Sequence, residues 1–226
     1  MPDIASVMAM LRHGDSFFPS GAVSFSWGLE SLVERGRVTS FADVSGFISG
    51  QLHGRWASFD LPVVMAAHRA CRDLAALAVI DELVEVHICV AELRLASRRL
   101  GDAMLAVFGR LGLEGATAYR LQVKNGQAHC HLSAMQGFLW ASSGHDETAA
   151  LVLSAHTFCT GLVGAAIRLG CLGHFDAQRI LSGIAAEVRD IASRPIPPLE
   201  RLSSCTVEAE IAIIWNASQE GRLFAT

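Results

Sequence analysis

The stretch "LVEVHICVAELRLASRRLGDAMLAVFGRL" (residues 83–111) carries the clearest secondary-structure signal in the chain. Nine of its positions are spaced alternately by three and four residues, and eight of the nine are apolar. These positions are Leu83, Val86, Val90, Leu93, Ser97, Leu100, Met104, Val107 and Leu111. Such spacing predicts one long amphipathic helix with a heptad-like seam, which ends among Gly109 and Gly112.

Helical periodicity continues on both sides of this stretch. Apolar residues recur at helical spacing over 4–11, 41–48, 147–170, 177–191 and 207–215. Ser40, Asp146 and Asp176 stand where caps belong, and Asp60-Leu-Pro62 has the form of a helix start. No stretch alternates convincingly with period two. The sequence therefore predicts an all-α protein, one irregular bundle of about eight to ten helices in a single domain over residues 1–226.

The composition is apolar for a chain of 226 residues. Hydrophobic residues make up 51% and charged residues 18%. Either the interior is large, or some apolar surface awaits a partner. The formal net charge is −4, and all but one of the 18 basic residues are arginine. A mildly acidic chain with scattered arginines argues against nucleic-acid binding.

The cysteines and the apolar segments indicate the cellular compartment. Six cysteines occur without any C-x-x-C motif, which predicts reduced and mostly buried thiols. The N-terminus lacks the pattern of a signal peptide. The segment 149–172 is apolar but contains His156 and Arg168, so we predict a buried helix rather than a membrane span. The expected localisation is cytoplasmic, without a membrane partner.

The sequence lacks the motifs of a serine hydrolase and of a Walker-type NTPase. "VSFSWG" places Ser26 two residues before Gly28, but Ser24 stands where a nucleophile elbow needs its first glycine, and no strand precedes it. Turn and capping roles explain these serines better. The sole lysine, Lys124, is followed by asparagine. A Walker-type phosphate loop requires lysine followed by serine or threonine, so that class is excluded.

Candidate metal ligands are paired but incomplete. The pairs are His87/Cys89, His129-Cys130-His131, His156/Cys159 and Cys171/His174. No run supplies four ligands, and H-E-x-x-H is absent, so buried thiols and hydrogen-bonded histidines are expected. Asp81, Glu82 and Glu85 are interpreted as a solvated helix face near a helix start. We assign no catalytic residue and no metal ligand.

Residues 15–30, "DSFFPSGAVSFSWGLE", resemble the signature of the UreF family of urease accessory proteins. Matching positions are Asp15, Ser16, Pro19, Ser20, Gly21, Ser26, Gly28, Leu29 and Glu30. Stretches at 60–70, 91–105, 130–138, 165–181 and 222–224 follow in the family's order. Departures from the pattern include Val23, Phe25, Ser133 and the ending "RLFAT" in place of "RLFRS".

The resemblance implies an all-α, non-enzymatic protein that tends to dimerise. It implies binding to UreD (also called UreH), recruitment of the GTPase UreG, and delivery of Ni²⁺ to apo-urease by the assembled complex. No cofactor would be bound stably. The alternatives are a helical metal-dependent enzyme or a divergent adaptor for another metalloenzyme.

The resemblance also suggests where partners bind. The candidate residues lie in the signature segment and in a C-terminal tail, residues 219–226, that we expect to become ordered against UreD rather than on its own domain. They are Asp15, Ser16, Pro19, Gly21, Ser26, Gly28, Glu30, Arg222, Leu223 and Phe224.

Overall fold

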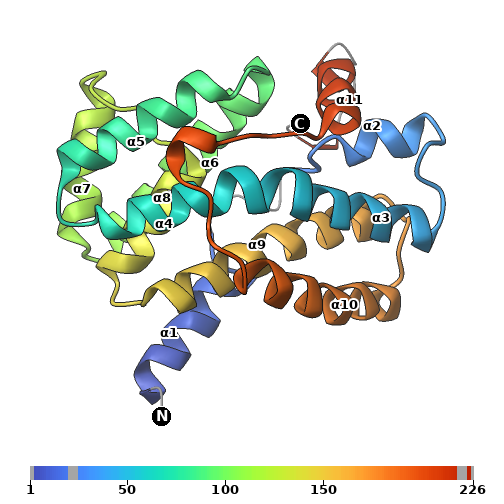
Figure 1. Cartoon of the computed structure of the whole chain (residues 1–226), viewed down its shortest axis with the longest axis horizontal. Helices are drawn as coiled ribbons and strands as arrows, with labels where there is room; N and C mark the ends of the chain where they lie inside the picture. Colours follow the sequence, from blue (N-terminus) through green and yellow to red (C-terminus); the bar gives the residue numbers. More distant parts are fainter. Residues whose placement is uncertain (1–2, 20–24, 218–222, 225–226) are drawn as a thin grey trace.

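A computed structural model describes residues 3–19, 25–217 and 223–224. Its α-helices are α1 (Ile4–Gly14), α2 (Leu29–Glu34), α3 (Phe41–Gln51), α4 (Leu61–Arg69), α5 (Leu74–His87), α6 (Ala91–Arg110), α7 (Glu114–Lys124), α8 (Leu132–Ser142), α9 (Glu147–Arg168), α10 (His174–Ala192) and α11 (Val207–Ala217). A π-helix, η2 (Leu52–Asp60), joins α3 to α4, and a 3₁₀ turn, η3 (Leu199–Arg201), precedes α11. The described residues contain no strand, which confirms the all-α prediction. Helices α3, η2 and α4 form one continuous rod (Figure 1). Counted this way, the α-helices of the described residues make ten rods.

The centre of the fold is the pair of helices α4 and α8, with α9 packed beside α4. The two central helices come close because Gly137 of α8 has no side chain: a Cβ there would lie 2.1 Å from the Val64 carbonyl oxygen. Trp56 and Trp140 are buried in the same core. The Trp56 indole N–H donates to the Ser154 hydroxyl at 2.9 Å, so this large ring is buried with its polar group satisfied.

The single long helix predicted over 83–111 is wrong, because the chain breaks at residues 88–90 between α5 and α6. Ile88 and Val90 adopt extended backbone angles, with ψ of 98° and 117°, and both side chains are buried. The Arg94 guanidinium donates to the Ile88 carbonyl at 3.3 Å, which satisfies a helix-end acceptor. No glycine or proline marks this break. It arises because the tertiary core takes up both β-branched side chains.

The predicted helix start at residues 60–62 is also wrong, because the helix passes through it. Pro62 removes the N–H that would bond to Ser58, and the turn before it is π-helical, with the Leu61 N–H donating to the Trp56 carbonyl. The freed Ser58 carbonyl accepts the backbone N–H of Ser203 at 3.2 Å. The segment before α11 therefore donates the hydrogen bond that Pro62 cannot supply within the helix.

Asp81 is not on a solvated face, contrary to the sequence interpretation; it is fully buried. Its carboxylate accepts the Tyr119 hydroxyl at 2.9 Å and the backbone N–H groups of residues 129, 130 and 131 at 2.8, 2.6 and 2.8 Å. Glu85, one turn on, pairs with the Arg98 guanidinium and the His131 ring. The carboxylates of α5 thus hold the loop that leads into α8.

Helix α9 fits the predicted buried segment. It is the one helix within the described ranges whose length and apolar composition would suffice to cross a membrane. Half of its apolar window is buried inside the protein, where it packs on α1, α4, α8 and α10. All six cysteines are free thiols; Cys130 and Cys159 are buried, whereas Cys89 and Cys205 are exposed, so "mostly buried" holds for only part of the set.

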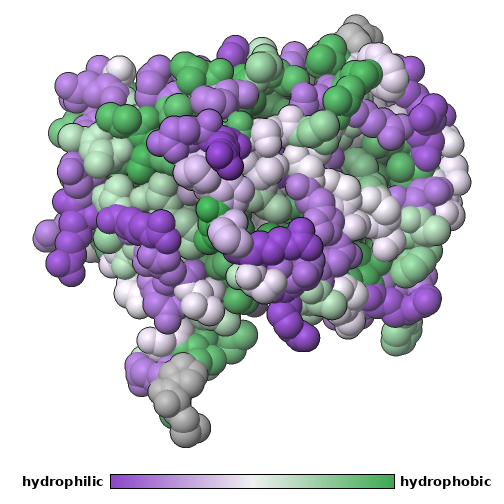
Figure 2. All heavy atoms as spheres, viewed as in Figure 1, coloured by the Kyte–Doolittle hydropathy of each residue, from purple (hydrophilic) through white to green (hydrophobic). Residues whose placement is uncertain are grey.

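Two predicted apolar stripes lie on the surface instead of in the core. Helix α1 projects from the body (Figure 1), and its stripe is exposed: Ile4, Val7, Met8 and Leu11. Helix α11 exposes Val207, Ile211, Ile214 and Trp215, which we call the α11 patch. Figure 2 shows hydrophobic side chains gathered over α11 and around the base of α1. The apolar composition therefore reflects surface as well as interior.

Candidate partner-binding surface

The first half of the signature segment turns the chain out of α1. The Asp15 carboxylate accepts the Phe17 backbone N–H at 2.8 Å, an Asx-type turn. This turn buries Phe18 against Phe108, with ring centroids 5.4 Å apart, while Phe17 is almost fully exposed. Ser16 and Pro19 lie on the surface with Asp15. Gly21 lies outside the described residues.

The second half enters α2 through a left-handed turn. Trp27 has φ of 54° and Gly28 has φ of 86°. Glycine is needed at residue 28 for a further reason, because a Cβ there would lie 2.6 Å from the Ala209 carbonyl of α11. Ser26 is fully buried, and its hydroxyl faces the Glu30 backbone N–H at 3.5 Å. The predicted tight backbone at Gly28 is therefore what brings α2 against α11.

A buried arginine supports this turn from inside the protein. Arg55 of η2 is 4% exposed, pairs with Asp60 at 3.1 Å, and stacks 4.8 Å from the Trp27 ring centroid. Burial raises the pKa of Asp60, and the Arg55 charge opposes that rise. The pair spans one π-turn, so the unusual helix geometry places both groups under the signature segment. Residue spacing alone gave no sign of this role for Arg55.

The described part of the tail packs on its own domain. Phe224 is 4% exposed and lies under the Arg168 guanidinium, 4.3 Å from the ring centroid. The Leu223 backbone N–H donates to the buried Glu30 carboxylate at 2.7 Å, while the Leu223 side chain is 75% exposed. The expectation of a tail free of its own domain is thus wrong for Phe224. Arg222 and the rest of 219–226 lie outside the described residues.

These contacts assemble one surface from both ends of the chain. In the signature segment, the Glu30 carboxylate accepts a hydrogen bond from the tail, and Gly28 allows close packing on α11. The α11 patch lies beside these contacts. Arg35 stacks on Trp215 at 4.0 Å, and Arg37 pairs with Glu208 at 3.0 Å, so charged groups rim the patch. An exposed apolar centre with an aromatic ring and a polar rim is typical of a protein-binding surface.

The candidate metal pairs do not converge. His129 pairs with Glu82 at 2.6 Å and His131 with Glu85 at 2.8 Å. His156 is exposed, whereas Cys159 is buried. Burial raises the pKa of the Cys159 thiol to about 12. Across residues 3–19, 25–217 and 223–224, no three His, Cys, Asp or Glu side chains group in a way that could hold a metal ion.

Two histidines are buried together beneath the base of α1. His13 Nδ1 lies 2.9 Å from His145 Nε2, and both side chains are about 95% buried. Burial, the neighbouring His145 and Arg12 together lower the pKa of His13 from 6.5 to about 4. Burial is also the largest cause of the lowered pKa of His145. The fold therefore holds the pair neutral.

This pair predicts acid-sensitive stability. Because the folded pKa lies below the unfolded value, the stabilisation is complete above pH 6.5 and is lost as pH falls toward 4. We expect a loss of roughly 1–3 kcal/mol between pH 7 and 4.5 from His13 alone. Urea unfolding at several pH values measures it, and His13→Gln should flatten the dependence over this range. An equally steep dependence in the variant would contradict the assignment.

Comparison with known proteins identifies the family of this chain. The sequence profile of UreF matches residues 38–185. A protein of Trichodesmium erythraeum (strain IMS101) called "Urease accessory protein UreF" is 31% identical over 227 residues, covering 99% of this chain and 98% of its own length. Proteins of the same name from Rhizobium johnstonii and Yersinia pseudotuberculosis are 31% and 28% identical, covering 92% and 94% of this chain and 90% and 99% of their own lengths. This chain belongs to the UreF family of urease accessory proteins.

Proposed function

We propose that this chain is a non-enzymatic scaffold of urease maturation. It binds UreD (UreH), the pair recruits the GTPase UreG, and the assembly inserts Ni²⁺ into apo-urease in the cytoplasm. The proposal rests on the α11 patch, an exposed apolar face of a helix that packs against the signature segment, next to the tail. A chain that lacks a phosphate-binding lysine motif needs a separate GTPase, which supports the recruitment of UreG.

UreD is assigned to the α11 patch on physical grounds. Burying one large apolar side chain contributes about 1.5–3 kcal/mol, and the patch offers four, with Leu223 nearby. Phe224 anchors the described end of the tail in the core, so Leu223 is presented from a fixed backbone position. A preorganised surface loses less conformational entropy when a partner binds.

Nickel is the cargo of the complex and not a resident cofactor of this chain. The paired histidines and carboxylates of α5 and residues 129–131 are already satisfied by hydrogen bonds to one another. A homodimer is proposed as the working unit. The uncovered stripe of α1 and the apolar groove between α9 and α10, lined by Leu151, Val152 and Ile184 among others, support self-association.

The binding step is tested by changing the α11 patch. Ile211→Glu/Ile214→Glu should weaken capture of purified UreD at least tenfold, because two charges would be desolvated at the interface. Circular dichroism and the melting temperature should barely change, since both side chains are exposed. Val79→Glu is the control, because Val79 is an exposed apolar residue of α5 outside the α11 patch. Undiminished capture by the double variant would reject this face as the UreD site.

A further inference from the structure

We propose that the groove between the C-terminal half of α6 and α7 is a second docking site, for an amphipathic helix of a partner protein with acidic side chains. The groove has a volume of about 710 Å³, and none of its lining residues belongs to the α11 patch. The described residues of the signature segment and of the tail do not line it. The site therefore adds a surface beyond the one that the proposed function uses.

The floor of the groove is apolar and lets a helix approach closely. Gly109 lies where α6 meets α7, since a Cβ there would be 3.2 Å from the Thr117 hydroxyl. Leu105 is buried at the base, Ala106 and Ala118 add only small side chains, and Leu121 is 59% exposed. Small floor residues with one exposed leucine leave room for the apolar face of an incoming helix.

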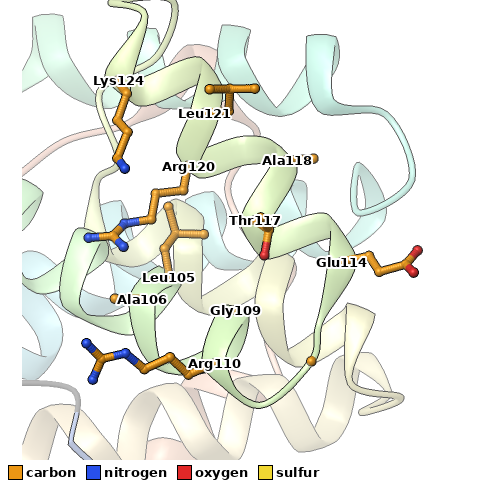
Figure 3. A pocket seen from close by; sticks show the side chains of 11 residues that line it. Leu105, Ala106, Gly109, Arg110, Glu114, Thr117, Ala118, Arg120, Leu121 and Lys124 are labelled. Carbon is orange, nitrogen blue, oxygen red and sulfur yellow. The ribbon is translucent and has the colours of Figure 1, made fainter.

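One side of the groove is cationic. Figure 3 shows Arg110, Arg120 and Lys124 pointing to the same side of the α6–α7 pair, with Leu105 and Ala106 between them and Glu114 pointing away. Arg120 is held by Asp102 through two bonds of 2.9 and 3.1 Å. Arg110 and Lys124 have no ion-pair or hydrogen-bond partner within the described ranges, so their charges remain for a ligand.

The apolar floor and the cationic edge together favour an acidic amphipathic helix as the ligand. A positive edge on a protein of net charge −4 favours an acidic partner by charge complementarity. The apolar floor requires hydrophobic side chains next to those acids, which a nucleic acid does not offer. A helix with leucines on one face and glutamates along its edge places both at once, because residues three and four apart share a face.

The test uses a synthetic helix of about 18 residues with leucines on one face and glutamates beside them, and a twin with lysine for every glutamate. Binding to the full chain is followed by fluorescence anisotropy. We expect the acidic peptide to bind and the basic twin not to bind. Arg110→Glu/Lys124→Glu should weaken binding at least tenfold. Ala118→Trp, which fills the floor without changing charge, should weaken it about fivefold.

Arg72→Glu/Arg201→Glu is the control, since both arginines are exposed and lie outside the groove. It should change binding less than twofold. The proposal is overturned if the acidic peptide does not bind, if the control loses as much as the groove variant, or if Ala118→Trp has no effect. Tighter, charge-dependent binding of anionic vesicles or of a single-stranded oligonucleotide would also overturn it, in favour of those ligands.

Discussion

Gly137→Ala is expected to destabilise the fold severely. The new methyl group would lie 2.1 Å from the Val64 carbonyl oxygen and 2.9 Å from the His68 backbone nitrogen. Both are main-chain atoms of α4, so no side chain can move aside, and α4 must separate from α8 at the centre of the core. We expect a loss of about 3–5 kcal/mol or more, a large part of the 5–15 kcal/mol typical of a domain.

The matched control is Gly183→Ala on α10, where nothing lies within 4 Å of the added methyl group. Replacing glycine in an exposed helix interior should stabilise the protein by roughly 0.5–1 kcal/mol. Urea unfolding of both variants measures the difference, with soluble yield as a second readout. A Gly137→Ala protein with a wild-type unfolding midpoint would show that α4 and α8 are not packed as described.

Asp81→Asn is expected to cost about 3–5 kcal/mol. The carboxylate accepts four hydrogen bonds, three from the backbone of residues 129–131 and one from Tyr119. An asparagine keeps one oxygen and replaces the other with an NH₂ group, which faces at least one donor in either orientation. Buried N–H groups are left unsatisfied, and the loop before α8 loses its anchor.

Glu82→Gln provides the comparison, because its carboxylate is exposed and, among the described residues, pairs with His129 alone. An exposed pair of this kind contributes about 1 kcal/mol or less. Denaturant midpoints of the two variants should therefore differ clearly. Equal, small losses would mean that Asp81 is solvated, as the sequence first suggested, and that the loop is held by other contacts.

Local signals in the sequence predicted the helices and some of their caps. Ser40 forms a capping box with Asp43, and Asp146 accepts the Ala149 backbone N–H at 2.7 Å. Asp176 lies in the first turn of α10, but Gly173 occupies the cap position. These motifs are readable because donor and acceptor lie within a few residues of one another. The break at 88–90, by contrast, depends on distant packing.

The spacing of apolar residues predicted less well which helix faces are buried. The stripe of α10 is buried at Ala177, Ile180, Ile184 and Ile191, whereas stripes of the same spacing on α1 and α11 are exposed. Amphipathic spacing shows that one face is apolar, but not whether the covering surface belongs to the same chain. The buried roles of Arg55 and Asp81 depend on residues far along the chain, so no local pattern could reveal them.

If this chain enables nickel insertion into urease, the nickel content of urease should depend on it. Apo-urease would be produced with UreD and UreG, with or without this chain, and purified for elemental analysis and activity. We predict nickel-loaded, active urease only when this chain is present, and a sharp loss with Ile211→Glu/Ile214→Glu but not with Val79→Glu. Equal nickel content in urease made without this chain would show that the chain has no role in nickel insertion.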